Sequence, residues 1–148
     1  YLFGTGTGLA PFMSIVRDPE AYERFDKIVL VHCVRQVSEL AYHDYLTEEL
    51  LGHEFLGEEV RDKLIYYPTV TREPFRNTGR ITTLVGSGKL ADDIGLPPLN
   101  AETDRVMLCG SPAMLDELTG MLDAMGFAAS AQQGEPGDYV IERAFVEK

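Results

Sequence analysis

Long apolar runs, separated by polar segments rich in glycine and proline, set the expected secondary structure of this chain. The run at 27–34 is nearly continuous and rich in β-branched residues, which is typical of a parallel strand covered on both faces. A second long run, at 63–71, contains Pro68 near its middle, which favours a short strand or an edge position. Shorter runs of the same kind predict three further strands, at 1–3, 105–110 and 139–141.

Helical periodicity fills the segments between these runs. We expect a short helix over 12–25, interrupted at Asp18-Pro19, and shorter helices near 81–84 and within 90–103. Ser38 is the expected N-cap of a helix over 39–52, whose apolar residues form one stripe: Leu40, Tyr42, Leu46, Leu50 and Leu51.

The best-marked helix is the one expected over 112–125. Ser111 is a good N-cap residue, and Pro112 follows at the first helical position. Gly126 comes directly after the last periodic residue, where a helix C-terminus favours glycine. Strands that alternate with helices in this way predict an α/β fold: a doubly wound, open parallel sheet of about five strands, Rossmann-like. We expect one domain over residues 1–148.

A glycine-rich turn directly follows the first predicted strand. It alternates two residue types, as Gly4, Thr5, Gly6, Thr7 and Gly8. Pro11 then stands where a helix takes its first turn. A tight turn before a helix start presents backbone N–H groups at the positive end of the helix dipole, which is a geometry that binds a diphosphate. The G-x-G-x-x-G pattern is incomplete because Leu9 occupies its last position, so a turn built only for close packing is the alternative.

Three arginines follow the central predicted strands. In an open parallel sheet the ligand lies across the carboxyl ends of the strands. Arg35 ends the strand at 27–34, and Arg72 and Arg80 come after the next strand. A carboxylate at the first of these places would accept hydrogen bonds from a ribose 2′-hydroxyl, whereas an arginine pairs with a 2′-phosphate. The pattern therefore favours NADP(H) over NAD(H), the alternative being that each arginine forms an ordinary surface ion pair.

Charge and composition narrow the function classes. With 13 Lys and Arg against 24 Asp and Glu, the net charge is −11, which disfavours nucleic acid and anionic membranes as partners. No apolar run approaches the roughly 20 residues that cross a bilayer. Cys33 and Cys109 lie far apart in apolar runs, so we expect no disulfide, no metal site and a cytoplasmic location. Cys33 is expected to be a core residue, and His32 a core or surface residue rather than a metal ligand.

The glycine-rich segment 4–12 resembles the NADP-diphosphate loop of the ferredoxin–NADP+ reductase family. The resemblance extends over most of the chain, to 31–35, 70–73, 78–81, 107–112 and 143–148. The last of these is similar to the tail of the bacterial ferredoxin (flavodoxin)–NADP+ reductases. The resemblance implies a flavoenzyme that exchanges a hydride between FAD and NADP(H) and single electrons with ferredoxin or flavodoxin.

In that family FAD is held by an N-terminal β-barrel domain with an Arg-x-Tyr-Ser type of motif, which this sequence lacks. The resemblance therefore implies that residues 1–148 are the NADP(H)-binding domain, that the FAD domain is missing from this chain, and that the chain alone is inactive. We expect the full-length protein to be a monomer. The alternatives are the reductase component of an oxygenase, a flavohaemoglobin-type enzyme, and a non-catalytic NADP-sensing module.

The resemblance also implies roles for single residues. Thr5, Gly6, Thr7 and Gly8 would bind the diphosphate and the nicotinamide ribose, and Arg35, Arg72 and Arg80 the 2′-phosphate. Cys109, followed by Gly110, Ser111 and Pro112, would lie beside the nicotinamide at the point of hydride transfer. Phe145 would cover the flavin, and Ala144 occupies the place of a catalytic carboxylate, which argues against a side-chain proton relay there. Without the resemblance, Cys109 is expected to be a core residue and Phe145 to pack the terminus.

Overall fold

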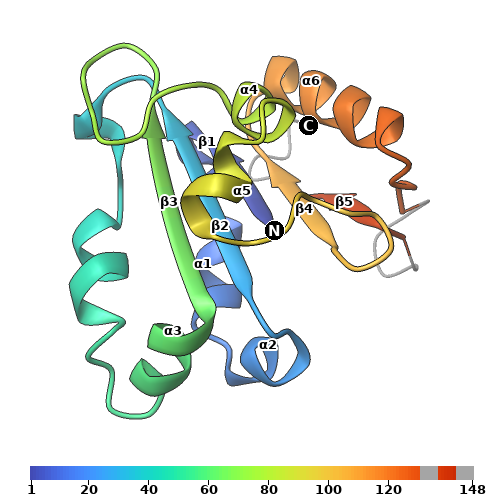
Figure 1. The fold of residues 1–148 in the computed structure, drawn as a ribbon. Helices are drawn as coiled ribbons and strands as arrows, with labels where there is room; N and C mark the ends of the chain where they lie inside the picture. Colours follow the sequence, from blue (N-terminus) through green and yellow to red (C-terminus); the bar gives the residue numbers. More distant parts are fainter. Residues whose placement is uncertain (131–136, 143–148) are drawn as a thin grey trace, which may run out of the picture.

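Five parallel strands form one sheet in the computed structural model, which describes residues 1–130 and 137–142 of the chain (Figure 1). Their order across the sheet is β3-β2-β1-β4-β5, and every pairing is parallel. This confirms the predicted open parallel sheet. The strands are β1 Leu2–Thr5, β2 Ile28–Val34, β3 Leu64–Val70, β4 Val106–Cys109 and β5 Tyr139–Ile141.

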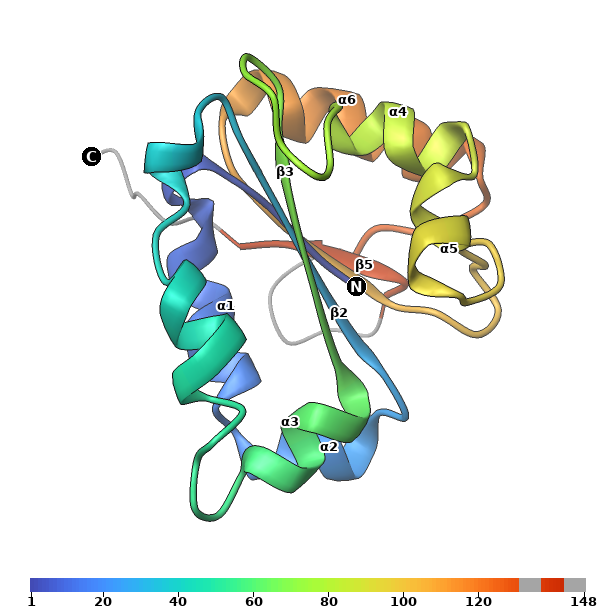
Figure 2. The ribbon, with the colours of Figure 1, turned by 60° about the vertical axis from the view of Figure 1, so that its left-hand side comes forward.

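Helices cover both faces of the sheet, which explains why β2 is buried along its whole length. Leu30 belongs to the apolar cluster on one face and Val31 to the cluster on the other, and both are fully buried. Figure 2 shows the sheet between the two helical layers. One layer contains α1 Ala10–Val16, α2 Pro19–Arg24 and α3 Gly57–Lys63; the other contains α4 Ile81–Gly86, α5 Lys89–Ile94 and α6 Pro112–Ala124.

The helix ends agree with several of the sequence signals. The side chain of Asp18 accepts a hydrogen bond from the Glu20 backbone N–H at 3.0 Å, which separates α2 from α1. The hydroxyl of Ser111 accepts one from Met114 at 3.3 Å at the start of α6. Gly126 has a φ of +89°, the left-handed conformation expected after a helix. These predicted ends are confirmed.

The edge position predicted from Pro68 is also confirmed. β3 lies at one edge of the sheet and pairs only with β2 among the described strands. The Asn77 side-chain amide donates to the Pro68 carbonyl at 2.9 Å. The Tyr67 hydroxyl donates to the Asp93 carboxylate at 2.6 Å, which ties this edge to α5.

One continuous helix over 39–52, as predicted, is wrong because the segment is broken. A 3-10 turn, η2 Val37–Glu39, is capped by Gln36 rather than Ser38, and the helical stretch that follows covers only 43–49, within which η3 Tyr45–Glu49 is π-helical. Tyr42 interrupts the segment because its φ is +63°, and its side chain is exposed. Leu46 and Leu50 are nevertheless buried, so their burial does not require one continuous helix. The polar stretch that follows contains α3, which the sequence signals did not delimit.

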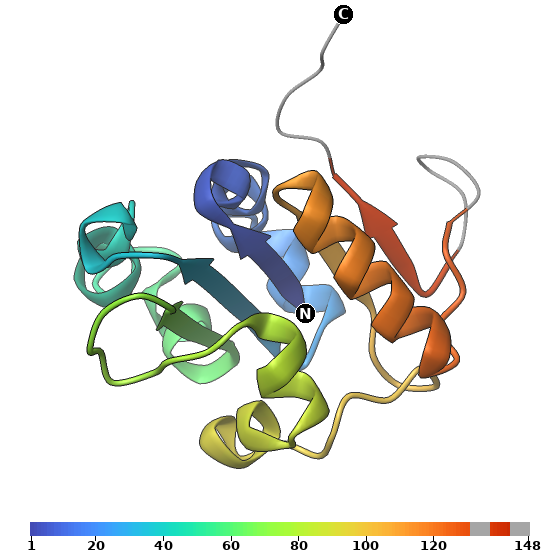
Figure 3. The ribbon, with the colours of Figure 1, turned by 90° about the horizontal axis from the view of Figure 1, so that it is seen from above.

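The order in which the chain adds strands to the sheet reverses between β1 and β4. β2 and β3 lie on one side of β1, and β4 and β5 lie on the other. α1 follows β1 on one face and α6 follows β4 on the opposite face, so the two connections separate at the carboxyl ends of these strands. Figure 3 shows the first turns after β1 and β4 side by side. Such a switch point is where open parallel sheets bind their ligands.

Candidate functional site

A cavity of about 1160 Å³ opens at this switch point. Its walls come from the segments that directly follow β1, β2, β3 and β4 and from the start of α6. The cavity gathers nearly all the residues that the sequence predicted for cofactor binding. The lining residues are 5–8, 33–35, 39, 71–72, 80 and 110–115.

Three predicted site residues lie outside the cavity lining. Gly4 is buried in β1, and a side chain there would meet the Gly8 carbonyl oxygen and the Phe12 ring at 3.3 Å. Pro11 lies in the first turn of α1, as predicted. Cys109 is only 2% exposed at the end of β4, paired in register with Gly4. None of the three lines the cavity as the described residues form it.

Gly8 and Gly110 allow two backbone segments to lie against each other at the floor of the cavity. A Cβ atom on Gly8 would lie 2.3 Å from the Cys109 carbonyl oxygen, and one on Gly110 would lie 2.0 Å from the Thr5 hydroxyl. The same hydroxyl accepts a hydrogen bond from the Ser111 backbone N–H at 3.3 Å. Close packing is therefore one function of the glycine-rich turn.

Gly6 differs from its neighbours because it faces open space. Its φ is +55°, and no heavy atom lies within 4 Å of the position of a Cβ atom. Gly6 belongs to a 3-10 turn, η1 Gly6–Leu9, that leads into α1. Its carbonyl oxygen lies 2.7 Å from Nε2 of His32, a fully buried residue of β2. The strand, tight turn and helix start predicted from the sequence are all present.

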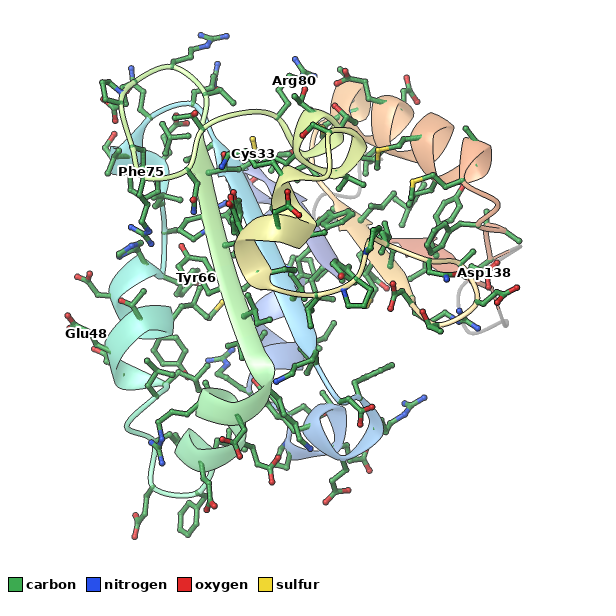
Figure 4. All side chains as sticks on the ribbon, viewed as in Figure 1. Cys33, Glu48, Tyr66, Phe75, Arg80 and Asp138 are labelled. Carbon is green, nitrogen blue, oxygen red and sulfur yellow. The ribbon has the colours of Figure 1, made fainter. Side chains whose placement is uncertain are left out.

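The three arginines reach the cavity from two neighbouring loops. The Arg72 backbone N–H donates to the Arg35 carbonyl at 2.9 Å, so these two residues lie side by side. Arg80 immediately precedes α4 and lies at the same end of the sheet as Cys33 (Figure 4). The sequence predicted this convergence only on the condition that the loop folds back. The structure brings Arg35, Arg72 and Arg80 to one cavity.

Two of these arginines already have carboxylate partners. Arg35 lies 4.0 Å from Glu39, and Arg80 forms an ion pair with Glu117 of α6. The side chains of Arg35 and Arg80 are 64% and 52% exposed, and exposed ion pairs of this kind contribute only about 0–1 kcal/mol. An anion that enters the cavity can therefore compete for both guanidinium groups.

Cys33 is both a core residue and part of the cavity wall, and the sequence predicted only the first. It is buried in the apolar cluster of the α4–α6 face, as predicted, and it also lines the cavity. Burial raises the pKa of its thiol, while the positive charge of Arg80 opposes the shift. A thiol with a raised pKa is a poor nucleophile at neutral pH, so Cys33 contributes shape and an apolar surface to the wall.

Several lining residues were not predicted from the sequence. Thr71 follows β3 directly, Glu39 closes a capping box with Gln36, and Met114 and Leu115 lie in the first turns of α6. The sequence did contain a signal for Glu39, because a glutamate three residues after an N-cap position is the spacing of a capping box. In the structure its carboxylate accepts a hydrogen bond from the Gln36 backbone N–H. The α6 residues could be placed only once the sheet order was known.

The remaining predictions concern catalysis and metals. Ala144 and Phe145 lie outside the described residues. Within residues 1–130 and 137–142, no group of three or more His, Cys, Asp or Glu side chains could hold a metal ion. No helix in that part of the chain is long and apolar enough to cross a membrane.

Comparison with known proteins places this site in a family. Residues 2–119 match the family described as the oxidoreductase NAD-binding domain. The chain is 62% identical over 148 residues to a ferredoxin–NADP reductase of Pseudomonas aeruginosa, and 64% identical to one of Azotobacter vinelandii. Both alignments cover all of this chain and 57% of the relative, so the chain spans a little over half the length of these relatives.

A solved structure agrees with the sequence comparison. The chain is similar to a ferredoxin NADP+ reductase from Neisseria gonorrhoeae crystallised with bound FAD and NADP, with a TM-score of 0.81 and 30% sequence identity. The match covers 97% of this chain and 55% of that one. The chain therefore belongs to the oxidoreductase NAD-binding domain family. Within this family it groups with the corresponding domain of bacterial ferredoxin–NADP reductases.

Proposed function

We propose that the cavity binds NADP(H), with the diphosphate over residues 5–8 and the 2′-phosphate among Arg35, Arg72 and Arg80. The observation that carries this proposal is the convergence of three arginines on one cavity in a chain of net charge −11. Two of them come from neighbouring strand ends joined by a backbone hydrogen bond. A dianionic phosphate accounts for this local excess of positive charge.

The shape of the cavity fits a dinucleotide. Its volume of about 1160 Å³ is slightly above the roughly 300–1,000 Å³ typical of small-molecule sites. The open space in front of Gly6 lets a ligand approach the backbone closely. Two helical segments, η1 with α1 and α6, begin at the cavity. Their partial positive charge favours a diphosphate between them.

The nicotinamide is expected at the end of the cavity formed by 110–115. Gly110, Ser111 and Pro112 would hold the ribose and the ring edge, and the apolar side chains of Met114 and Leu115 would exclude water. Cys109 lies one residue before this wall, and its place beside the nicotinamide stays a prediction, as do the roles of Ala144 and Phe145. These residues would bind and orient the cofactor, whose own chemistry is hydride transfer.

We further propose that the chain is the NADP(H)-binding domain of a ferredoxin (flavodoxin)–NADP+ reductase whose FAD is held mainly by a separate N-terminal barrel domain. The relatives support this, because this chain covers 57% of their length. When bound, FAD would supply the exchange between hydride and single-electron transfer. With a net charge of −11, this domain would not attract an acidic electron carrier, so ferredoxin or flavodoxin is expected to dock on the other domain. A cytoplasmic, monomeric protein stays our expectation.

The enzymatic proposal is tested on the protein produced together with any residues that its gene encodes before Tyr1. We expect a bound yellow flavin and NADPH-dependent reduction of ferredoxin or flavodoxin. A protein that binds NADPH but no flavin would contradict the enzymatic proposal and favour the NADP-sensing module. A flavoprotein that reduces neither carrier would favour the oxygenase or flavohaemoglobin type.

A further inference from the structure

His32 is a polar residue in the middle of the apolar strand β2. Its side chain is fully buried, and among the residues that the structure describes only Thr69 is another buried polar residue. The register of the sheet places His32 beside Gly4, at the start of the glycine-rich turn. Burial of a polar ring has a cost unless the ring is hydrogen-bonded, so its contacts indicate what the position requires.

Within the part of the chain that the structure describes, the ring makes one hydrogen bond. Nε2 of His32 lies 2.7 Å from the carbonyl oxygen of Gly6. A carbonyl can only accept, so Nε2 carries the hydrogen, and this fixes the tautomer of the neutral ring. Nδ1 is buried and has no hydrogen-bond partner within the described residues. Burial also lowers the pKa of His32, so the ring is neutral near pH 7. The hydrogen bond to the Gly6 carbonyl is therefore the polar interaction that this imidazole makes within the described residues.

The bond determines the direction of the Gly6 carbonyl. Gly6 lines the cavity and has a left-handed φ of +55°, whereas His32 is buried and does not line it. The carbonyl oxygen therefore points into the domain, toward the imidazole. A carbonyl oxygen directed at the ligand would repel an anionic diphosphate, because both carry negative charge.

We propose that His32 is a positioning residue that holds the glycine-rich turn in its diphosphate-binding conformation by fixing the Gly6 carbonyl. This inference rests on the proposed function, because it assumes that the diphosphate lies over residues 5–8. It also assigns a role to a histidine for which the sequence predicted none. The imidazole acts through the loop backbone and does not contact the cofactor.

The test compares two ligands on wild-type protein and His32 variants by isothermal titration calorimetry. NADP+ contains the diphosphate, and adenosine 2′-monophosphate carries the 2′-phosphate without it. His32→Leu removes the donor and should weaken NADP+ binding about tenfold, as the loss of one buried hydrogen bond allows. The affinity for adenosine 2′-monophosphate should stay within about twofold.

Two conservative variants test whether a hydrogen-bond donor at the position of Nε2 is what matters, rather than the imidazole ring as a whole. A glutamine amide can reach the position of Nε2, so His32→Gln should restore most of the NADP+ affinity. An asparagine amide reaches only as far as Nδ1, so His32→Asn should behave like the leucine variant. If His32→Leu does not fold, the glutamine and asparagine variants still decide the question. Equal NADP+ affinity in these two would overturn the proposal.

Tyr22→Phe is the matched control. It removes a hydrogen bond of the same kind, from the fully buried Tyr22 hydroxyl to the Val16 carbonyl at 2.6 Å, and Tyr22 does not line the cavity. It should lower the melting temperature and leave both affinities unchanged. Equal weakening of both ligands in His32→Leu would contradict a role confined to the diphosphate loop. Wild-type protein that binds neither ligand would instead refute the proposed function itself.

Discussion

The floor and the rim of the cavity are built in opposite ways. The floor, residues 5–8 with 109–110, is a contact between two chain segments that lie so close that a Cβ atom on Gly8 or Gly110 would clash. The rim, formed by Arg35, Arg72 and Arg80, consists of long side chains, and those of Arg35 and Arg80 are more than half exposed. The floor is fixed by the fold, whereas the rim can change without disturbing the core.

This difference separates two properties of a nucleotide site. The diphosphate occurs in both nicotinamide dinucleotides, and its expected binding surface is the part of the site that the sheet topology determines. The 2′-phosphate distinguishes NADP from NAD, and its expected ligands are exposed side chains that can be replaced individually. Affinity for the shared part of the ligand and selectivity for the 2′-phosphate should therefore respond to different substitutions.

The largest expected effect is on the floor. Gly8→Ala would place a methyl group 2.3 Å from the Cys109 carbonyl oxygen, and backbone atoms cannot rotate away as a side chain can. We expect a loss of about 3 kcal/mol or more of stability, measured by chemical denaturation.

Gly6→Ala is the control for this substitution, because its methyl group would meet no atom within 4 Å. Its cost should be only the roughly 1–2 kcal/mol of a left-handed conformation, and the domain should stay folded. Similar stabilities for the two variants would contradict the close contact at the floor.

The next effect is on selectivity at the rim. Arg72→Ala, and likewise Arg35→Ala or Arg80→Ala, should weaken NADP+ binding about tenfold and leave NAD+ affinity unchanged, because only the 2′-phosphate loses a partner. Isothermal titration with the two cofactors measures this difference. Arg105→Ala removes a similarly exposed arginine that pairs with Asp138 away from the cavity. If it lowered NADP+ affinity as much, net charge rather than contact would explain the result.

The pH dependence of stability should reveal His32, the buried histidine that contacts the Gly6 carbonyl of the floor. Burial lowers the pKa of His32 in the folded state below its ordinary value near 6.5. Below pH 6.5 the unfolded chain therefore binds a proton that the folded chain does not, and stability falls as the pH falls.

The slope for one such group is at most about 1.4 kcal/mol per pH unit. Urea denaturation from pH 7.5 to 5.5 should show this slope in the difference between wild type and His32→Gln, because the other titrating groups are common to both. A difference that does not depend on pH would contradict the folded-state environment described for His32.

The smallest effect should come from the carboxylates that compete for the rim. Glu117→Gln releases Arg80 from its ion pair and should tighten adenosine 2′-monophosphate binding about two- to fivefold, in line with exposed pairs of about 0.2–1 kcal/mol. Glu39→Gln should act in the same direction on Arg35. Glu102→Gln removes the same charge outside the cavity wall and serves as the control. Equal tightening in the control would assign the effect to net charge alone.

The sequence predicted the sheet well because its signals were strong and local. The apolar run of β2 requires burial on both faces, and Ser111, Pro112 and Gly126 mark both ends of α6. The helix over 39–52 was predicted from an apolar stripe, but such a stripe reports burial and not backbone conformation. Leu46 and Leu50 are buried, yet Tyr42 adopts a left-handed conformation between Leu40 and Leu46.

The predicted site depended on a rule of topology rather than on contacts. Residues that follow parallel strands meet at one edge of the sheet, so 5–8, Arg35, Arg72 and 110–112 could be grouped without knowing any distance. The role of Gly8 could not be divided between packing and ligand binding, because its limiting contact is with Cys109, about 100 residues away in the chain. The contact between His32 and the Gly6 carbonyl could not be predicted either, because these residues are also far apart in the sequence.

The central claim is that the arginine rim of this cavity binds a 2′-phosphate. Isothermal titration of the wild-type 148-residue chain with NADP+ and with NAD+, at the same pH and low ionic strength, tests it most directly. We predict that NADP+ binds at least about tenfold more tightly, a difference of about 1.4 kcal/mol, and that the preference shrinks as salt screens the arginines. Equal affinities for the two dinucleotides would contradict it.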